Sequence, residues 1–223
     1  MNGFTTPAAV GYGMGMQIDI VSDTVCPWCL IGKRRLARAL ETWTGAPPDI
    51  RWRPYQLAPE LPVEGMARDD YLAAKFGASE QAAAIFDRIA EEGRSEGIAF
   101  RFDRIARAPN TLDSHRLIRW AGTADCQDAV VEDLFRAYFT DGRDISDHDV
   151  LSGIAARNGM DGPLVARLLA EDRDRDLVSD EVSTARRLGI SGVPTFIFDS
   201  ALAVSGAQPP KALLAAMTEA AGQ

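Results

Sequence analysis

The sequence predicts an α/β protein in which one sheet-containing domain is built from both ends of the chain and is interrupted by an inserted all-helical domain. Three observations support this prediction. Residues 17–56 follow a strand–helix–strand pattern, about a hundred residues after position 60 are patterned as helices, and strand patterns return after residue 193. Because an isolated pair of strands is only marginally stable, the late strands are expected to join the first sheet.

The first unit begins with a strand at residues 17–22, where apolar and polar side chains alternate. The helix that follows carries Leu36, Leu40 and Trp43 on one apolar face. Residues 49–56 alternate again and predict a second strand. A helix crossover connects parallel strands, so these two should be parallel. The basic residues of the helix are expected to face water: Lys33, Arg34, Arg35 and Arg38.

The middle of the chain is predicted to be helical after a proline-rich loop at residues 57–67. Its strongest amphipathic pattern is formed by Val130, Val131, Leu134, Phe135, Tyr138 and Phe139. The predicted domain boundaries are a disordered leader at residues 1–15, a sheet domain made of residues 16–60 and 176–223, and an inserted helical domain at residues 61–175.

The strand pattern that returns late in the chain predicts a hairpin. Residues 194–198 and 201–204 are apolar and flank the turn-forming pair Asp199-Ser200. Two prolines, Pro209 and Pro210, then suit the start of a last helix. The late segment therefore supplies two strands and one helix.

Composition and charge narrow the function classes. The chain has 223 residues, of which 46% are hydrophobic and 25% charged, with a net charge of -8 and scattered basic residues. This pattern argues against nucleic acid or an anionic membrane as partner. Residues 1–15 lack both the basic residues and the continuous apolar run of a signal peptide. We therefore expect a cytoplasmic protein. Residues 1–15 are expected to be either a disordered leader or the product of a start codon assigned too early, with Met14 or Met16 as the alternative start.

The sequence Cys26-Pro27-Trp28-Cys29 lies where the first strand gives way to the helix. In a reducing compartment, such a close pair is more often catalytic or metal-binding than a permanent disulfide. Unpaired N–H groups at a helix N-terminus stabilise a thiolate, which is the reactive form of cysteine. We predict that Cys26 attacks a disulfide and that Cys29, one turn deeper, resolves the mixed disulfide.

A zinc site is the main alternative for a Cys-x-x-Cys pair. Two further ligands would have to come from Cys126, His115 or His148, none of which has a paired ligand spacing. We therefore expect no metal. A lone cysteine such as Cys126 is most often a small buried residue. We expect His115 to be a helix-packing or capping residue and His148 to be solvated.

The cysteine pair, followed late in the chain by Gly192-Val193-Pro194-Thr195-Phe196, resembles the thioredoxin fold. In that fold the proline is cis and packs against the cysteines, and the preceding residue offers its backbone to a bound peptide or thiol. The chain is also similar to the DsbA family, and specifically to its cytosolic FrnE-like branch. The segments that carry this resemblance are residues 22–33, 57–62, 110–111, 115–117, 189–196 and 205–208.

The resemblance implies a thiol–disulfide oxidoreductase or disulfide isomerase acting on proteins or small thiols. Pro27, Trp28, Val193 and Pro194 would then contact the substrate. No tightly bound cofactor is expected, and glutathione is a candidate co-substrate. Trp28 replaces the histidine of periplasmic DsbA, so extreme oxidising power is not expected.

The alternative functions are a glutathione-dependent isomerase or transferase and a non-catalytic zinc-binding module. The first resembles 2-hydroxychromene-2-carboxylate isomerases and kappa-class glutathione transferases, which typically have serine where Cys26 stands. A cysteine at this position favours redox chemistry. The sequence leaves open the physiological substrate, the direction of electron flow and the oligomeric state.

Overall fold

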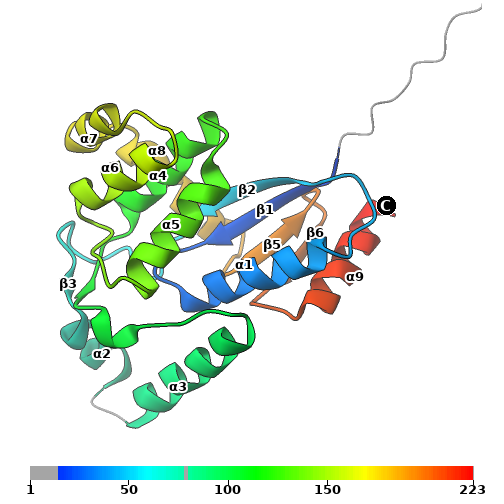
Figure 1. The fold of residues 1–223 in the computed structure, drawn as a ribbon, viewed down its shortest axis with the longest axis horizontal. Coiled ribbons are helices and arrows are strands. Elements are labelled where there is room, and N and C mark those ends of the chain that lie inside the picture. The colour runs from blue at the N-terminus through cyan, green and yellow to red at the C-terminus, as the bar shows by residue number, and fades with distance from the viewer. Residues whose placement is uncertain (1–14, 78–79, 223) are drawn as a thin grey trace, which may run out of the picture.

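A four-stranded sheet forms the centre of the computed structural model, which describes residues 15–77 and 80–222 (Figure 1). β1 pairs with β2 in parallel and with β5 in antiparallel register, and β6 extends the sheet beyond β5. The late hairpin therefore joins the first sheet, as predicted. The predicted leader lies outside the described residues except for Gly15. The strands are β1 (Gln17–Ser22), β2 (Asp49–Pro54), β5 (Thr195–Phe198) and β6 (Leu202–Ser205).

Helices cover the two faces of this sheet. α1 (Pro27–Leu40) and α9 (Pro210–Ala221) pack against each other on one face (Figure 1). Successive side chains of a strand point to opposite faces. Ile20 thus belongs to the main core with α1, whereas Val21 packs with Ala185 of α8 (Arg175–Arg187) on the other face.

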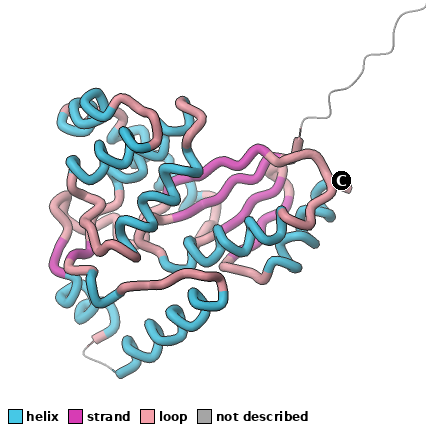
Figure 2. Tube along the Cα trace, viewed as in Figure 1, coloured by secondary structure: helices cyan, strands magenta, loops and turns pink. Residues whose placement is uncertain are grey.

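The inserted region is predominantly helical, as predicted (Figure 2). It also contains a two-residue antiparallel pair, β3 (Met66–Ala67) and β4 (Arg107–Ala108). Strands this short produce no detectable alternation in the sequence, which explains why the pattern predicted helices alone. The helices are α2 (Arg68–Phe76), α3 (Glu80–Ser95), α4 (Leu112–Thr123), α5 (Gln127–Phe139), α6 (His148–Arg157) and α7 (Gly162–Ala170), with a 3₁₀ turn at Phe102–Arg104.

The prediction that the basic face of α1 is solvated was wrong for Lys33 and Arg35, whose side chains are each 12% exposed, whereas Arg38 is exposed as predicted. Lys33 Nζ lies 2.8 Å from Asp128 of α5, and Arg35 Nε donates to Glu96 near the end of α3 at 2.8 Å. The side chain of Glu96 is only 4% exposed. Periodicity identifies a polar helix face but does not show whether water or an acidic helix covers it. Here the inserted helices cover it and fix the position of α1.

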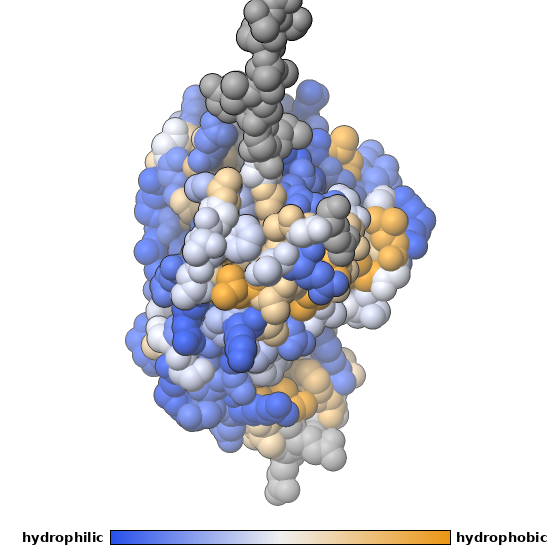
Figure 3. Space-filling model, turned by 90° about the vertical axis from the view of Figure 1, so that its right-hand side faces the viewer, coloured by the Kyte–Doolittle hydropathy of each residue, from blue (hydrophilic) through white to orange (hydrophobic). Residues whose placement is uncertain are grey.

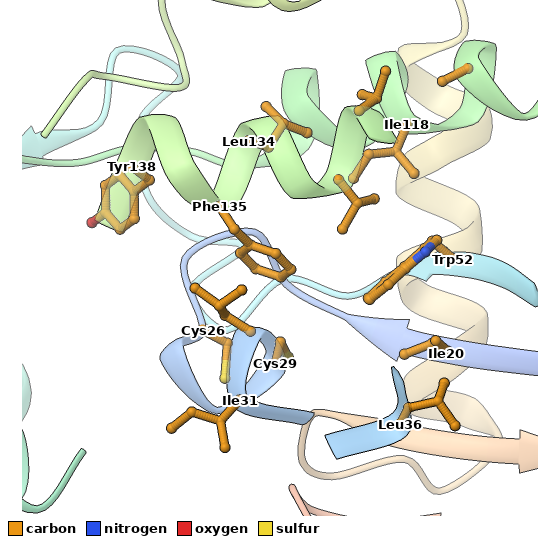
Figure 4. Packing of buried hydrophobic residues seen from close by; sticks show 14 of the residues in the cluster. Ile20, Cys26, Cys29, Ile31, Leu36, Trp52, Ile118, Leu134, Phe135 and Tyr138 are labelled. Atoms are coloured by element: carbon orange, nitrogen blue, oxygen red, sulfur yellow. The ribbon is translucent and has the colours of Figure 1, made fainter. Parts of the chain in front are cut away.

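A continuous apolar core joins the sheet, α1 and the inserted helices. Trp52 of β2 and Phe135 of α5 meet edge to face, with ring centroids 6.3 Å apart. Figure 4 shows Phe135 pointing from α5 toward the first turn of α1, where Cys26 and Cys29 lie. The first turn of α1 is therefore held between the sheet and the insertion. α5 is the helix that had the strongest amphipathic pattern, and its apolar side chains are buried.

The outer edge of β2 is closed by a side chain of α5. The backbone N–H of Trp52 donates to Gln127 Oε1 at 2.9 Å, and Gln127 Nε2 donates to the carbonyl oxygen of Trp52 at 3.4 Å. One glutamine thus occupies both backbone groups of this edge residue.

The surface is mixed in polarity. Figure 3 shows mostly hydrophilic residues on one side of the molecule, with smaller apolar patches that include the lower end, where α2 and α3 lie in Figure 1. Within the described ranges, no helix is both long and apolar enough to cross a membrane.

Candidate active site

Cys26 is the N-cap residue of α1. Its backbone is extended (φ -91°, ψ 111°), its N–H donates to the carbonyl oxygen of Asp23 at 3.0 Å, and Pro27 occupies the first turn. No acidic residue lies in that turn. The helix dipole favours negative charge at this end, and no neighbouring carboxylate within the turn opposes it. This position suits a thiolate nucleophile.

Cys29 lies one turn deeper and is 1% exposed. Burial is the main cause that raises the pKa of Cys29 well above its usual value, and a hydrogen bond with Cys26 raises it further. Hydrogen bonds with the Ser22 side chain and the Asp23 backbone act in the opposite direction but are weaker. Both cysteines are free thiols. Cys26 is also buried, at 4% exposed, but its sulfur contacts the carbonyl oxygen of Val193, whereas Cys29 contacts the Ser22 side chain and the Asp23 backbone.

The loop before β5 approaches Cys26 from the far end of the sequence. The Cys26 thiol donates to the carbonyl oxygen of Val193, with 3.6 Å between Sγ and the oxygen. The Val193–Pro194 peptide bond is cis, the geometry that the resemblance implies. The fold thus brings together two motifs that are 167 residues apart.

Gly32 allows this loop to lie directly against α1. A Cβ atom at Gly32 would be 2.9 Å from Cγ of Pro194 and 3.1 Å from Cζ of Phe196. Such contacts are too short for an unstrained helix, so a residue without a side chain is needed for the close approach. The sequence contained a signal for this role. A glycine inside a helix costs stability relative to alanine, so its presence usually has a packing or functional reason.

A pocket of about 320 Å³ opens beside the cysteine. Cys26, Pro27, Trp28 and Val193 line one side of it, whereas Cys29 and Pro194 are not among its lining residues. Another part of its wall comes from α2 and α3. These helices contribute mainly apolar side chains: Tyr71, Leu72, Phe76, Ile85, Phe86 and Ile89.

The comparisons with known proteins agree with this geometry. Residues 17–218 match the DSBA-like thioredoxin domain. The chain belongs to this family. A probable DsbA oxidoreductase from Streptomyces coelicolor is 34% identical to this DsbA-like protein, with a TM-score of 0.85 over 93% of this chain and 91% of that chain.

Two more distant structures share the fold of this DsbA-like protein. A cytosolic disulfide reductase, DsbM, from Pseudomonas aeruginosa, solved with GSH, is 18% identical with a TM-score of 0.57, covering 92% of this chain and 96% of that chain. A 2-hydroxychromene-2-carboxylate isomerase is 16% identical with a TM-score of 0.65, covering 91% of this chain and 95% of that chain.

Sequence reasoning missed a buried acid in this DsbA-like site. Asp23 is 1% exposed, and its Oδ2 accepts a hydrogen bond from the backbone N–H of Leu57 at 2.7 Å. Its Oδ1 has no hydrogen-bond partner among the described residues and lies 3.4 Å from His115 Nε2. That nitrogen is also 2.9 Å from the carbonyl oxygen of Tyr55. His115 thus packs from α4 against the loop after β2, as expected of a packing residue.

His148 is partly solvated, with its side chain 38% exposed, but it also contacts a buried carboxylate that the sequence did not predict. Its Nε2 lies 3.0 Å from Oδ2 of Asp113. The other carboxylate oxygen, Oδ1, accepts hydrogen bonds from Arg116 at 2.9 Å and from Arg175 at 3.1 Å. Burial alone would raise the pKa of Asp113, but hydrogen bonds from Arg116 and His148 and the charge of Arg175 outweigh burial and lower it. This network joins α4, α6 and α8 away from the cysteines.

Cys126 is the half-buried N-cap residue of α5, and its thiol donates to the carbonyl oxygen of Ala121 at 3.8 Å. Burial, and to a smaller extent the charge of Asp125, raise the pKa of Cys126. No cluster of three or more potential metal ligands occurs in residues 15–77 and 80–222. The structure therefore brings Cys126 to neither the cysteine pair nor a metal-binding cluster.

Proposed function

We propose that this DsbA-like protein is a thiol–disulfide oxidoreductase that works through Cys26 and Cys29. The observation that carries the proposal is the position of Cys26 at the start of α1, at a pocket wall and 3.6 Å from the carbonyl oxygen of Val193. Cys29 lies directly behind it. A nucleophile, a resolving group and a backbone contact for the partner are therefore adjacent.

In the reducing direction, the Cys26 thiolate attacks one sulfur of a substrate disulfide and forms a mixed disulfide. The other substrate sulfur leaves as a thiolate. Cys29 then loses its proton and attacks Sγ of Cys26, which releases the second substrate thiolate. Two electrons pass to the substrate, and the enzyme is left with a Cys26–Cys29 disulfide. The reverse sequence oxidises a dithiol.

The roles of the two cysteines can be separated by substitution. Cys26→Ser should abolish reduction of insulin disulfides and refolding of a scrambled disulfide protein. Cys29→Ser should keep the nucleophile and accumulate mixed disulfides, which non-reducing electrophoresis and mass spectrometry detect. Cys126→Ser is the matched control, because that cysteine is outside the site, and it should retain activity. Full activity of the Cys26→Ser protein would refute the proposal.

A glutathione-dependent isomerase or transferase is the second candidate function. The small, largely apolar pocket beside Cys26 favours it, because such a pocket fits a small molecule better than a folded protein. Glutathione would be the co-substrate, activated at Cys26. Turnover of a chromene carboxylate that requires glutathione and survives Cys29→Ser would support this candidate. If the Cys29→Ser protein loses that turnover, the result would support the dithiol mechanism.

The cytosolic location and the FrnE-like branch stay predictions from the sequence. Cell fractionation, combined with rapid alkylation of the cysteine pair, tests the location. A protein confined to the cytosolic fraction would agree with it, and recovery from an extracytoplasmic fraction would contradict it.

A further inference from the structure

The pocket beside Cys26 is a small, partly open site with a mainly apolar wall. Its volume of about 320 Å³ is at the lower end of the range for small-molecule sites, which is roughly 300–1,000 Å³. Four aromatic rings of its wall form a continuous edge-to-face series: Phe76–Phe86, Phe86–Phe102 and Phe102–Phe139, at 6.5, 5.0 and 6.3 Å between centroids. A compact apolar group would fill this space.

One cation, Arg68, is placed within this apolar wall. Its guanidinium carbon lies 5.0 Å from the ring centre of Phe86 and 5.8 Å from that of Phe102. Its Nη1 donates a single hydrogen bond of 3.3 Å to the carbonyl oxygen of Phe102. A guanidinium carries five N–H donors. Most of the N–H donors of Arg68 therefore form no hydrogen bond with a described residue.

Arg68 differs in this respect from Arg35 and Arg116, two other arginines that contact the core. Arg35 and Arg116 are each paired with a carboxylate, at 2.8 Å from Glu96 and 2.9 Å from Asp113. Arg68 forms no ion pair with any described carboxylate. A half-buried charge without a counter-ion is costly in an apolar environment. This arrangement favours an anionic group supplied by a ligand.

The second cation of the pocket does not compete for this role. Lys75 is exposed, donates to the hydroxyl of Tyr71 at 2.8 Å and contacts the rings of Tyr71 and Phe76 at 5.1 and 5.8 Å. The acid of the pocket, Asp23, belongs to the segment that leads into Cys26 and is next to His115. Positive charge from α2 and the nucleophile from α1 therefore line the same pocket from different elements.

We propose that the pocket takes a small apolar disulfide that bears a carboxylate, and that Arg68 binds this carboxylate while Cys26 attacks the disulfide. The inference rests on the oxidoreductase function and names a substrate class for it. Cys26 forms a mixed disulfide and expels one carboxylated thiolate. Cys29 then expels the second, so one protein dithiol is oxidised for each substrate disulfide reduced. Arg68 is a specificity-determining residue and takes no part in the sulfur exchange.

The test compares two aromatic disulfides with pre-reduced protein in single-turnover experiments. 5,5′-Dithiobis(2-nitrobenzoate) bears carboxylates and 2,2′-dithiodipyridine is neutral, and each releases a product that is followed by its absorbance. The measured quantity is the ratio of the second-order rate constants for the anionic and the neutral probe. Any change in the reactivity of Cys26 itself affects both rates and cancels in this ratio.

Arg68→Gln should lower this ratio at least about tenfold, which corresponds to about 1.4 kcal/mol. Arg68→Lys keeps the charge and should keep the ratio within about threefold of the wild type, since charge carries most of the attraction. Arg94→Gln is the matched control. It removes an exposed cation of α3 that does not line the pocket, and should change the ratio less than about twofold because surface charges are screened.

Three results would overturn the inference, and they are distinguishable. If Arg68→Gln changes the ratio no more than Arg94→Gln does, Arg68 does not bind the carboxylate of the probe. The proposed oxidoreductase function would not be affected by this result. If Arg68→Lys lowers the ratio as much as Arg68→Gln does, the positive charge is not what matters, and Arg68 acts through packing. If neither probe reacts with Cys26 in the wild-type protein, the oxidoreductase function itself fails.

Discussion

Replacing Gly32 with alanine tests whether the close approach of α1 to the Val193–Pro194 loop is a packing requirement. In an exposed helix this change stabilises a protein by about 0.5–1 kcal/mol, because alanine restricts the unfolded chain and favours helix. At Gly32 the added methyl group would lie 2.9 Å from Cγ of Pro194 and 3.1 Å from Cζ of Phe196. Both neighbours are buried, and neither is the free end of a flexible chain.

Overpacking of this kind costs roughly 1–3 kcal/mol. The net effect of Gly32→Ala on the free energy of unfolding should therefore range from about zero to a loss of about 2.5 kcal/mol. Gly153→Ala in α6 is the matched control, because Gly153 is an exposed helix residue whose added Cβ would meet nothing within 4 Å. That variant should gain about 0.5–1 kcal/mol.

The intrinsic helix preference is common to both variants, so the difference between them isolates the packing cost. Urea unfolding followed by circular dichroism gives both free energies, and the difference should be roughly 1–3 kcal/mol. The rate of Cys26 alkylation in the Gly32→Ala protein reports whether Pro194 has also been displaced from the cysteine. If Gly32→Ala is as stabilising as Gly153→Ala, the contact with Pro194 and Phe196 does not constrain the helix and the reasoning is refuted.

Two further predictions follow from the titrating groups. The lowered pKa of Asp113 contributes stability that is present above its unfolded value of about 3.9 and is lost as the pH falls through the lower folded value. Unfolding free energies measured from pH 6 to 3 should therefore decline more steeply for the wild type than for Asp113→Asn, and equal slopes would contradict this. The raised pKa of Cys29 predicts that iodoacetamide at pH 7 modifies Cys26 faster than Cys29 in the reduced protein. Peptide mass spectrometry measures both rates, and preferential labelling of Cys29 would reverse the assigned roles.

The fold was predictable where a pattern in the sequence has one physical explanation. Alternation at residues 17–22 and an apolar run beside a turn at residues 194–198 predicted strands, and the instability of an isolated hairpin predicted that they share a sheet. The Cys26-to-Cys29 motif and the Val193–Pro194 motif were recognisable because each is local. Their contact at 3.6 Å followed from the resemblance and not from the spacing of residues.

Features that depend on partners distant in sequence were not predictable. The polar face of α1 gave no sign that Glu96 and Asp128 would cover it, because an amphipathic pattern does not distinguish water from a charged neighbour. Arg68 resembled any arginine in the first turn of a helix. Its placement among aromatic rings depends on how α2 and α3 fold back toward Cys26, and no local rule contains that information.

The two hydrogen bonds between Gln127 and Trp52 affect whether another chain can add a strand to this sheet. An unpaired edge strand is a template for strand addition by another chain and hence for aggregation. Gln127 occupies the backbone N–H and carbonyl of Trp52 at 2.9 and 3.4 Å, as a residue of a neighbouring strand would. A foreign strand can pair at that position only after the start of α5 has moved away. Protection against aggregation at this edge is thus coupled to the docking of the inserted helices.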